Sequence, residues 1–188
     1  METFFRKVAE FVQLGTEARS ALAAILVYQE APKGHLLLKP HAVCNHIYFV
    51  ESGLTRTFYL KEGKDVTDWL SPQGTFACSV MSFINRQPDR RGIELLEPSR
   101  LWVLHHDELE ELYRQHHQLE RMGRLIVGSG IIQLQQRFDD LHFATAAERY
   151  QKLMKEQPSL IQRTPLGMIA SYLGITQETL SRIRSHVA

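Results

Sequence analysis

Polar side chains gather near the C-terminus at positions that would share one face of a short helix. The residues that point away from the apolar positions of that helix are Thr176, Gln177, Glu178, Thr179, Ser181, Arg182 and Arg184. Amide, hydroxyl, carboxylate and guanidinium groups are the donors and acceptors that contact phosphates and base edges in DNA. The pattern predicts a DNA contact at this face, with an ordinary helical hairpin as the alternative.

The residues in front of this face predict a first helix and a sharp turn. Leu166, Ile169 and Leu173 recur at helical spacing, so they share one apolar face. Ala170 is small where a second helix must approach closely, and Gly174 can adopt the positive φ of a tight turn. A helix that ends at Gly174 is therefore expected.

A second helix is predicted to begin at Thr176, whose hydroxyl can cap the first backbone amides. Leu180 and Ile183 then face inward, toward the first helix. Two helices joined by a short turn form a helix-turn-helix, which places its second helix in the major groove of DNA. The C-terminal residues are thus predicted to read DNA.

The composition is typical of a globular protein. The chain has 188 residues, of which 44% are hydrophobic and 23% are charged. No apolar run approaches the roughly 20 residues that a membrane span needs, and the N-terminus lacks the apolar stretch of a signal peptide. Cys44 and Cys78 are too few for a disulfide scaffold or an iron–sulfur cluster, and they predict a reducing cytoplasm.

Charge is unevenly distributed along the chain. The net charge is +1, with 22 Lys and Arg against 21 Asp and Glu. Residues 145–188 hold six basic and three acidic side chains, a charge of +3, which leaves −2 for residues 1–144. A modestly basic C-terminal part suits contact with a polyanion at one end of the molecule.

The rest of the chain predicts an α+β fold. Phe4, Val8, Phe11 and Val12 recur at helical spacing, and a second helix is expected after Thr16. Short strand-like runs follow at residues 47–50, 54–60, 66–70, 93–96 and 100–104, with turn signals between them. Many short strands over roughly 70 residues predict a sandwich or a small barrel.

A long helix is predicted from about residue 107 to residue 141. Gly128 and Gly130 in its middle each cost roughly 1 kcal/mol relative to Ala, so they suit a close approach by another backbone or a ligand. An interruption of the helix at these glycines is the alternative. Its apolar residues cover more surface than one monomer's core needs; they are Leu112, Leu119, Met122, Leu125, Ile126, Ile131, Ile132, Leu134 and Phe138.

This order of elements resembles the Crp/Fnr superfamily of bacterial transcription regulators over nearly the whole chain. The most specific likeness is Ile169-Ala-Ser-Tyr-Leu-Gly-Ile-Thr-Gln-Glu-Thr-Leu-Ser-Arg-Ile, which looks like the DNA-reading motif of that family. The hairpin Ile47-Tyr-Phe-Val-Glu-Ser-Gly-Leu and the stretch Gly74-Thr-Phe are also similar. The resemblance implies an N-terminal double-stranded β-helix, or β-roll, of the cyclic-nucleotide-binding kind, flanked by helices.

The resemblance also implies partners and roles for single residues. The protein would be a cytoplasmic homodimer on a pseudo-palindromic double-stranded DNA operator, with RNA polymerase as a further partner and no membrane contact. Two copies would meet along the long helix, through apolar residues from Leu119 to Ile132. Arg182 would donate to guanine, and Gln177 would pair with an adenine edge. Glu178 would either accept from cytosine or orient the Arg182 side chain. Phosphate contacts or support of the helix would fall to Thr176, Thr179, Ser181 and Arg184.

Residues 74–91, here called the cassette, depart from the family pattern. Members that bind cyclic nucleotides carry Gly-Glu soon after Gly-x-Phe, where the Glu takes the ribose hydroxyl, and an Arg about ten residues on takes the cyclic phosphate. Cys78 and Ser79 stand at the Gly-Glu positions. Arg90 or Arg91 would supply the phosphate contact only with a shift of one or two residues, and a solvated turn is the alternative for both. Cyclic AMP is therefore not expected as the effector, and either loss of effector dependence or a different small-molecule effector in the roll is expected instead. The candidate effector pocket consists of Phe76, Ala77, Cys78, Ser79, Arg90 and Arg91.

Two other classes of protein stay open. A small barrel with His35, His41, His46 and Glu51 invites comparison with metal-binding cupins, but the His-x-His pair of cupins is missing. His105 and His106 are adjacent and would point to opposite faces of a strand. A β-roll that only dimerises or binds other proteins is the second alternative. No Ser/His/Asp grouping or phosphate-binding glycine loop is evident, so we expect no catalysis, metal or resident cofactor.

We therefore divide the chain into residues 1–143, the β-roll with its long dimerisation helix, and residues 144–188, a helix-turn-helix domain without a full wing. Many such regulators continue beyond this point into a β-hairpin that touches phosphate, so fewer backbone contacts are expected here. The predicted function is sequence-specific DNA binding by a transcription regulator whose effector pocket is degenerate.

Overall fold

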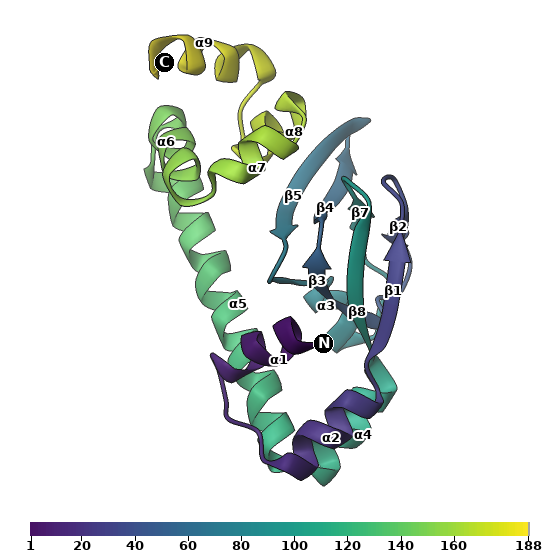
Figure 1. The fold of residues 1–188 in the computed structure, drawn as a ribbon. Helices are drawn as coiled ribbons and strands as arrows, with labels where there is room; N and C mark the ends of the chain where they lie inside the picture. The colour runs from purple at the N-terminus through teal and green to yellow at the C-terminus, as the bar shows by residue number, and fades with distance from the viewer. Residues whose placement is uncertain (188) are drawn as a thin grey trace.

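The computed structural model describes residues 1–187, which form a β-roll, a long helix along one side of it, and a group of short helices at the C-terminal end (Figure 1). Two helices precede the roll, α1 (Glu2–Ala9) and α2 (Thr16–Ala24). Phe4 and Val8 of α1 are fully buried, as the helical spacing predicts. Phe11 and Val12 lie beyond the end of α1, because the chain turns after Ala9 toward α2.

The roll consists of two four-stranded antiparallel sheets. One has the strand order β1-β8-β3-β6 and the other β2-β7-β4-β5, so each sheet takes strands from both halves of the roll. This interleaved order is that of a double-stranded β-helix and confirms the predicted α+β class. The strands are β1 (Val27–Ala31), β2 (Leu36–Leu38), β3 (His46–Ser52), β4 (Leu54–Lys61), β5 (Lys64–Pro72), β6 (Phe76–Ala77), β7 (Gly92–Leu95) and β8 (Ser99–His105).

The five strands predicted from the sequence are confirmed as β3, β4, β5, β7 and β8. The predicted runs do not include β1, β2 or β6, which are short and, in the case of β1, largely exposed. Between the two sheets the interior is filled by apolar side chains rather than left open. The buried members of this filling are Tyr48, Val50, Ala77, Leu95, Leu101 and Val103.

The turn between β3 and β4 depends on Gly53. Its φ is +113°, and a Cβ at this position would lie 2.0 Å from Ser99 Oγ. An L-residue would be strained in that backbone conformation and would also clash with the start of β8. The turn therefore brings the tip of the β3–β4 hairpin directly against the β7–β8 connection.

The helix predicted over about residues 107–141 is two helices, α4 (His106–Gln115) and α5 (His117–Phe143). They are separated by His116, whose backbone is extended. The break lets Leu112 of α4 and Leu119 of α5 enter the same core together with α1 and α2. Helix α5 runs through Gly128 and Gly130 without interruption, so the alternative of a break there is wrong.

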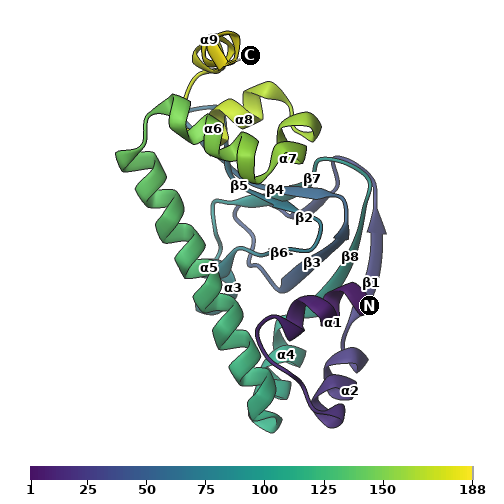
Figure 2. The same cartoon turned by 60° about the vertical axis from the view of Figure 1, so that its left-hand side comes forward.

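Four short helices complete the chain: α6 (Ala146–Glu156), α7 (Pro158–Arg163), α8 (Leu166–Tyr172) and α9 (Gln177–Val187). A capping box fixes the start of α6, because Thr145 Oγ1 accepts from the Glu148 amide while the Glu148 side chain accepts from the Thr145 amide. Helices α6–α8 lie over one end of the roll, and α9 is the outermost element (Figure 2). None of the helices within residues 1–187 combines the length and apolarity that a bilayer crossing requires.

Candidate nucleic-acid interface and effector cassette

Helices α8 and α9 form the predicted pair joined by a tight turn. Gly174 has a φ of +70°, and the Ile175 amide donates to the Ala170 carbonyl at 3.0 Å. Ala170 is 1% exposed, and it is buried in the same cluster as Leu180 of α9. Ile169 and Leu173 are buried on the same face of α8. The small residue, the glycine and the apolar face thus occupy the positions that the sequence predicts.

The start of α9 is capped by Thr176. Its Oγ1 accepts from the Thr179 amide at 3.2 Å, which satisfies one of the backbone donors at the helix start. Leu180 is fully buried and Ile183 is partly buried, so both face inward as predicted. The polar face of α9 is held outward because the helix is fixed at its cap and along its apolar side.

The residues predicted to contact DNA lie on the outer side of α9. Thr179 is partly buried; the others, Thr176, Gln177, Glu178, Ser181, Arg182 and Arg184, are exposed. Arg182 Nη2 lies 3.4 Å from Thr179 Oγ1. Backbone hydrogen bonding at the helix start, with the Thr176 hydroxyl and the charge of Arg182, lowers the pKa of Glu178, so its carboxylate stays ionised. The face therefore offers both donors and an acceptor.

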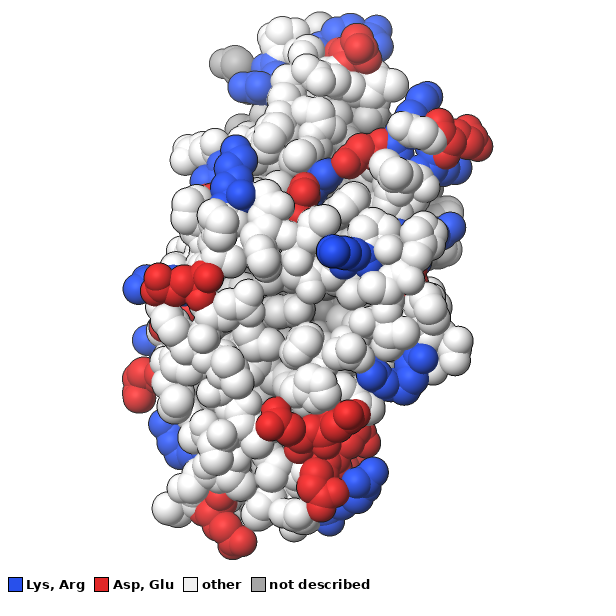
Figure 3. All heavy atoms as spheres, turned by 90° about the vertical axis from the view of Figure 1, so that its right-hand side faces the viewer, with Lys and Arg blue, Asp and Glu red and all other residues white. Residues whose placement is uncertain are grey.

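Part of the positive charge counted in residues 145–188 is already used inside the molecule. Arg149 donates to the carbonyls of Leu173 and Ala144, at 3.0 and 2.5 Å. Lys152 pairs with Asp140 at 2.7 Å, and Arg163 pairs with Glu97. The exposed basic residues that remain are Lys155, Arg182 and Arg184. On the face shown in Figure 3, Lys and Arg are scattered, while the largest acidic group lies far from the C-terminal helices.

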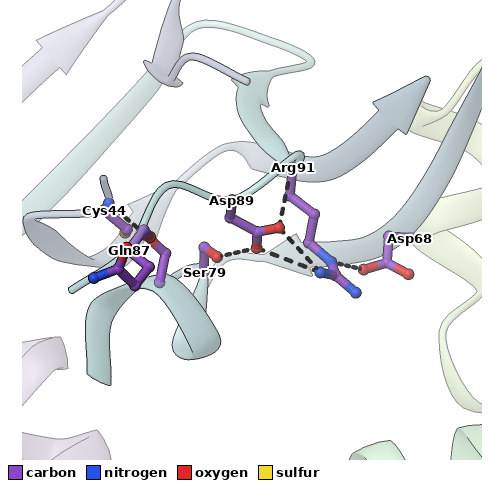
Figure 4. Close-up of polar contacts among 7 residues, drawn as sticks. Cys44, Asp68, Ser79, Gln87, Asp89 and Arg91 are labelled. Carbon is purple, nitrogen blue, oxygen red and sulfur yellow. Dashed lines mark hydrogen bonds and ion pairs between the residues drawn. The ribbon is translucent and has the colours of Figure 1, made fainter. Parts of the chain in front are cut away.

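The cassette comprises β6, the short helix α3 (Val80–Asn85) and the loop that leads into β7. At its centre Ser79 Oγ donates to Asp89 Oδ2 at 2.5 Å, and Asp89 is 6% exposed. Arg91 Nη1 lies 3.3 Å from both oxygens of Asp89, and its Nε donates to Asp68 at 2.7 Å (Figure 4). Burial alone would raise the pKa of Asp89, but the Ser79 hydroxyl and Arg91 outweigh burial and lower it.

These contacts decide what the two cassette arginines can bind. Arg91 is partly buried and committed to two carboxylates of its own chain, while Arg90 is exposed and lies over the ring of Tyr59. The sequence reasoning missed Asp89, although a signal was present: it follows Ser79 by ten residues, the spacing of the Glu–Arg pair in the resemblance. The carboxylate of Asp89 thus stands at the position where cyclic-nucleotide-binding members carry the phosphate-binding Arg.

The other predicted pocket residues lie in packed surroundings. The Phe76 ring packs against Phe4 and Phe49, with centroids 6.2 and 5.3 Å away, and Ala77 is 2% exposed. Two hollows, of about 400 and 210 Å³, lie beside α1. Neither is lined by any of the six residues predicted to form the effector pocket.

The C-terminal helices share a core with the roll. Leu54, Leu70 and Leu96 of the roll are buried in the same cluster as residues from α6–α9: Tyr150, Leu153, Leu160, Ile169, Ala170, Leu173 and Leu180. Around this core, Arg163 pairs with Glu97 and donates to the Gly53 carbonyl at 2.9 Å; we call these three groups the latch. A second contact joins Ser171 Oγ to the Thr67 amide at 2.9 Å.

The outer face of α5 carries a continuous apolar stripe, which we call the seam: Val127, Ile131, Leu134, Phe138 and Leu141. These residues alternate at spacings of four and three, and between 37% and 63% of each is exposed. Leu119 and Met122, predicted to form part of the dimer contact, are 0% and 2% exposed. That part of the prediction is wrong, because both side chains fill the core against α1, α2 and α4.

The histidines of the cupin alternative do not converge on one point. His46 and His105 face each other across β3 and β8 with ring centroids 5.1 Å apart, while His106 packs on Phe83. His105 ends β8 and His106 begins α4, so the two rings have different neighbours and the expectation for adjacent strand residues does not apply. Within residues 1–187 there is no cluster of three or more His, Cys, Asp or Glu side chains that could hold a metal ion.

Comparisons with known proteins find one matching domain family and many similar solved structures. Residues 28–116 match the family model of the cyclic nucleotide-binding domain. FixK2 from Bradyrhizobium japonicum is similar in structure, with a TM-score of 0.75 and 17% identity over 87% of this chain and 84% of that chain. The Thermus thermophilus catabolite activator protein has a TM-score of 0.59 and 18% identity, over 94% and 85% of the two chains.

A third similar structure is CLP from Xanthomonas campestris, described as a c-di-GMP-responsive global regulator. Its TM-score is 0.71 and its identity 14%, over 92% of this chain and 91% of that chain. A putative regulator of the Crp/Fnr family from Eubacterium rectale aligns with a TM-score of 0.73. A search of curated proteins found no match. The resemblance to Crp/Fnr regulators is thus confirmed at the level of the whole fold.

Proposed function

We propose that this chain, which has the fold of the Crp/Fnr regulators, is a homodimeric transcription regulator that binds DNA in a sequence-specific way. The observation that carries the proposal is the exposed polar face of α9, on a helix that is capped at Thr176 and anchored by Leu180. A rigid helix at the outer end of the molecule can enter a major groove without rearrangement of its own chain.

Base reading falls to three residues of this face. Arg182 is a bidentate donor for guanine O6 and N7, Gln177 pairs with an adenine edge, and Glu178 accepts from cytosine or orients Arg182. Each such base contact contributes about 1–3 kcal/mol of discrimination. Thr176, Thr179, Ser181 and Arg184 contact phosphate or support the helix, which sets the register on the duplex.

Dimerisation is assigned to the seam of α5. Spacings of four and three residues keep apolar side chains on one side of a helix that wraps around a second helix, as in a coiled coil. Gly128 and Gly130 lie within this stretch, and a methyl group on either would meet no described atom within 4 Å. A two-fold contact here presents two copies of α9 to successive major grooves, roughly 34 Å apart.

The effector pocket is proposed to be degenerate. A cyclic phosphate placed in the cassette would meet the ionised carboxylate of Asp89, while the nearby cation of Arg91 is already neutralised by Asp89 and Asp68. The negative charges of the phosphate and of the Asp89 carboxylate would repel each other. Moving Asp89 aside would separate this buried carboxylate from its partners Ser79 and Arg91. We therefore propose that cyclic AMP does not control this regulator.

The test is selection from a randomised duplex library with the purified protein at fixed salt. We expect a pseudo-palindrome whose half-sites are centred about one helical turn apart. Arg182→Ala should lose the preference at one position of each half-site, by a factor of roughly 5–150. Arg114→Ala is the matched control, because Arg114 is an exposed arginine on α4, far from α9, and should leave the selected sequence unchanged.

Two outcomes would contradict the proposal. The first is an absence of enrichment for the wild-type protein, which would move the protein-binding β-roll alternative ahead. The second is a selected sequence that Arg182→Ala leaves intact. The effector part is tested separately by adding cyclic AMP to the same assay: unchanged affinity is expected, and tighter binding would show that the cassette still accepts a cyclic phosphate.

A further inference from the structure

Two cysteines that are far apart in the sequence meet at the cassette. Cys44, in the loop before β3, and Cys78, just before α3, have their sulfur atoms 3.8 Å apart. Both are free thiols; Cys44 is 1% exposed and Cys78 is partly exposed. Neither the proposed DNA-binding face nor the seam includes these two cysteines. Both cysteines precede Ser79 in the sequence, whereas Asp89 follows it.

The backbone around Cys44 is fixed by the cassette itself. The Cys44 amide donates to Ser82 Oγ at 2.9 Å, and Ser82 in turn donates to the Gln87 carbonyl at 2.5 Å (Figure 4). On the other side, Arg86 Nη1 donates to the Cys44 carbonyl at 2.9 Å. These contacts fix the backbone on both sides of Cys44, and Cys78 directly precedes Ser79, whose hydroxyl donates to Asp89. The proximity of the two sulfur atoms is therefore built into the fold.

We propose that Cys44 and Cys78 form a reversible dithiol–disulfide site that reacts with two-electron oxidants of the hydroperoxide class. A disulfide bond is about 2.05 Å long, so the two sulfur atoms need to approach by about 1.8 Å, a movement that rotation about the side-chain bonds can provide. This site goes beyond the DNA-reading function and does not depend on it.

The two thiols are chemically unequal in a way that suits the reaction. The hydrogen bond with Cys78, aided by the backbone at Ser79 and the charge of Arg86, outweighs burial and lowers the pKa of Cys44 to about 6. The same hydrogen bond and burial raise the pKa of Cys78 well above its usual range. Cys44 is therefore the more readily ionised of the two thiols, as suits an attacking cysteine, and Cys78 the more readily protonated, as suits a resolving one.

The reaction proceeds in two steps. The Cys44 thiolate attacks one oxygen of hydrogen peroxide, the O–O bond breaks, and Cys44 sulfenic acid and hydroxide form as sulfur gives up two electrons. The Cys78 thiol then attacks the sulfenic sulfur; its proton leaves with the sulfenic hydroxyl as water, and the Cys44–Cys78 disulfide forms. A dithiol reductant returns both thiols and is itself oxidised to a disulfide.

The test uses the full chain under native conditions with a small excess of hydrogen peroxide. We expect both free thiols to disappear together, the mass to fall by two hydrogen atoms, and a non-reducing peptide map to join the peptides of Cys44 and Cys78. Dithiothreitol should restore the thiols. The same treatment in concentrated urea should form the disulfide at least tenfold more slowly, because unfolding removes the contacts that hold the thiols together.

Two matched variants assign the roles of the cysteines. Cys78→Ser removes the resolving thiol, so dimedone should trap a sulfenic acid at Cys44. Cys44→Ser removes the attacking thiolate, so Cys78 should stay a free thiol under the same dose. The proposal is overturned if the wild-type protein gains oxygen without forming the cross-link, if the cross-link joins two chains, or if folded and unfolded protein react at the same rate.

Discussion

Arg182 and Arg184 are both exposed on α9, yet our proposal gives them different tasks. A base contact adds specificity, whereas a phosphate contact adds affinity for every sequence. Arg184→Ala should weaken binding to specific and random duplexes alike. It should also reduce the slope of log affinity against log salt by about 2 for a dimer, one phosphate contact per protomer.

The measurement is a salt titration of binding by fluorescence anisotropy. Lys155→Ala is the matched control, because it removes the same charge from an exposed position on α6, outside α9. A slope that falls equally in both variants would mean that general charge, not a contact of α9 with phosphate, sets the salt dependence.

Asp89 predicts a pH dependence of stability. Because its pKa is lowered in the folded protein, its ionised form stabilises the fold above the ordinary Asp pKa of about 3.9. That contribution is lost as the pH falls through the lowered pKa. Asp89→Asn should therefore reduce the free energy of unfolding at pH 7, and the difference from wild type should narrow as the pH falls below about 4.

Urea unfolding of the two proteins at several pH values measures this difference. Asp139→Asn serves as control, because Asp139 is a partly buried acid on α5 whose carboxylate accepts a hydrogen bond from the Gln135 amide rather than from a cation. If the difference in free energy of unfolding between wild type and Asp89→Asn stays constant down to pH 3, the charge of Asp89 does not contribute to stability, and only its packing and neutral hydrogen bonds do.

The residues of α9 could be predicted from the sequence because their chemistry is local. A cap, a glycine with positive φ and apolar residues at helical spacing lie within about twenty residues, and each acts on its neighbours. Asp89 and the Cys44–Cys78 pair were missed for the opposite reason, although the ten-residue spacing of Asp89 from Ser79 was a local signal. Their meaning depends on partners from other strands and loops, such as Asp68, that only the fold brings near.

At the scale of elements, the seam of α5 predicts how the protein self-associates. Leu134 is 61% exposed, so a polar replacement should leave the folded chain intact. In a dimer that buries the seam, each copy of Leu134→Lys loses about 1.5–3 kcal/mol of apolar burial and adds a charge to the contact. We expect the dimer to dissociate at least about a hundredfold more readily.

Analytical ultracentrifugation over a range of concentrations measures this change. Gln136→Lys is the matched control, because Gln136 is exposed on the same helix but lies outside the 4-3 repeat. Equal dissociation of both variants would indicate charge repulsion between the copies rather than loss of a specific contact, and an unchanged Leu134→Lys dimer would place the interface elsewhere.

Helices and strands could be predicted from the sequence where their apolar residues pack into the core of their own chain. Strands β3, β4, β5, β7 and β8 are short runs bounded by turn signals such as Ser52-Gly53, and they stand where the sequence predicts them. The apolar residues of α5 serve two purposes at once: Leu119 and Met122 fill the monomer core, and Ile131 and Leu134 face outward. Composition cannot separate these two groups, because burial depends on where α1, α2 and α4 lie. The break at His116 was missed for the same reason.

At the scale of the whole molecule, the latch predicts how firmly the C-terminal helices are held. Arg163 joins α7 to Glu97 and to the Gly53 carbonyl, and these groups are only partly exposed. Removing a charged donor from such hydrogen bonds costs about 1.5 kcal/mol. Arg163→Ala should therefore make local opening of α7 and α8 roughly tenfold more frequent, while the fold remains.

Hydrogen exchange followed by mass spectrometry reads this out peptide by peptide. Faster exchange is expected in residues 158–173 and at the Thr67 amide, which donates to Ser171. Arg114→Ala is the control, because it breaks an exposed pair with Glu111 on α4. Faster exchange spread over the whole chain would show that the variant weakens global stability and not the latch.

The core that Leu54, Leu70 and Leu96 share with the C-terminal helices also limits how this protein could be recombined with others. A chimaera cut between residues 143 and 144 would separate α6–α9 from the leucines that cover them and leave bare apolar surface on both fragments. A functional transplant would have to carry the β4–β5 hairpin and Leu96, which follows β7, along with the helices. If α9 reads DNA as proposed, an exchange of specificity between such proteins is then easier by replacing the outer face of α9 than by shuffling whole domains.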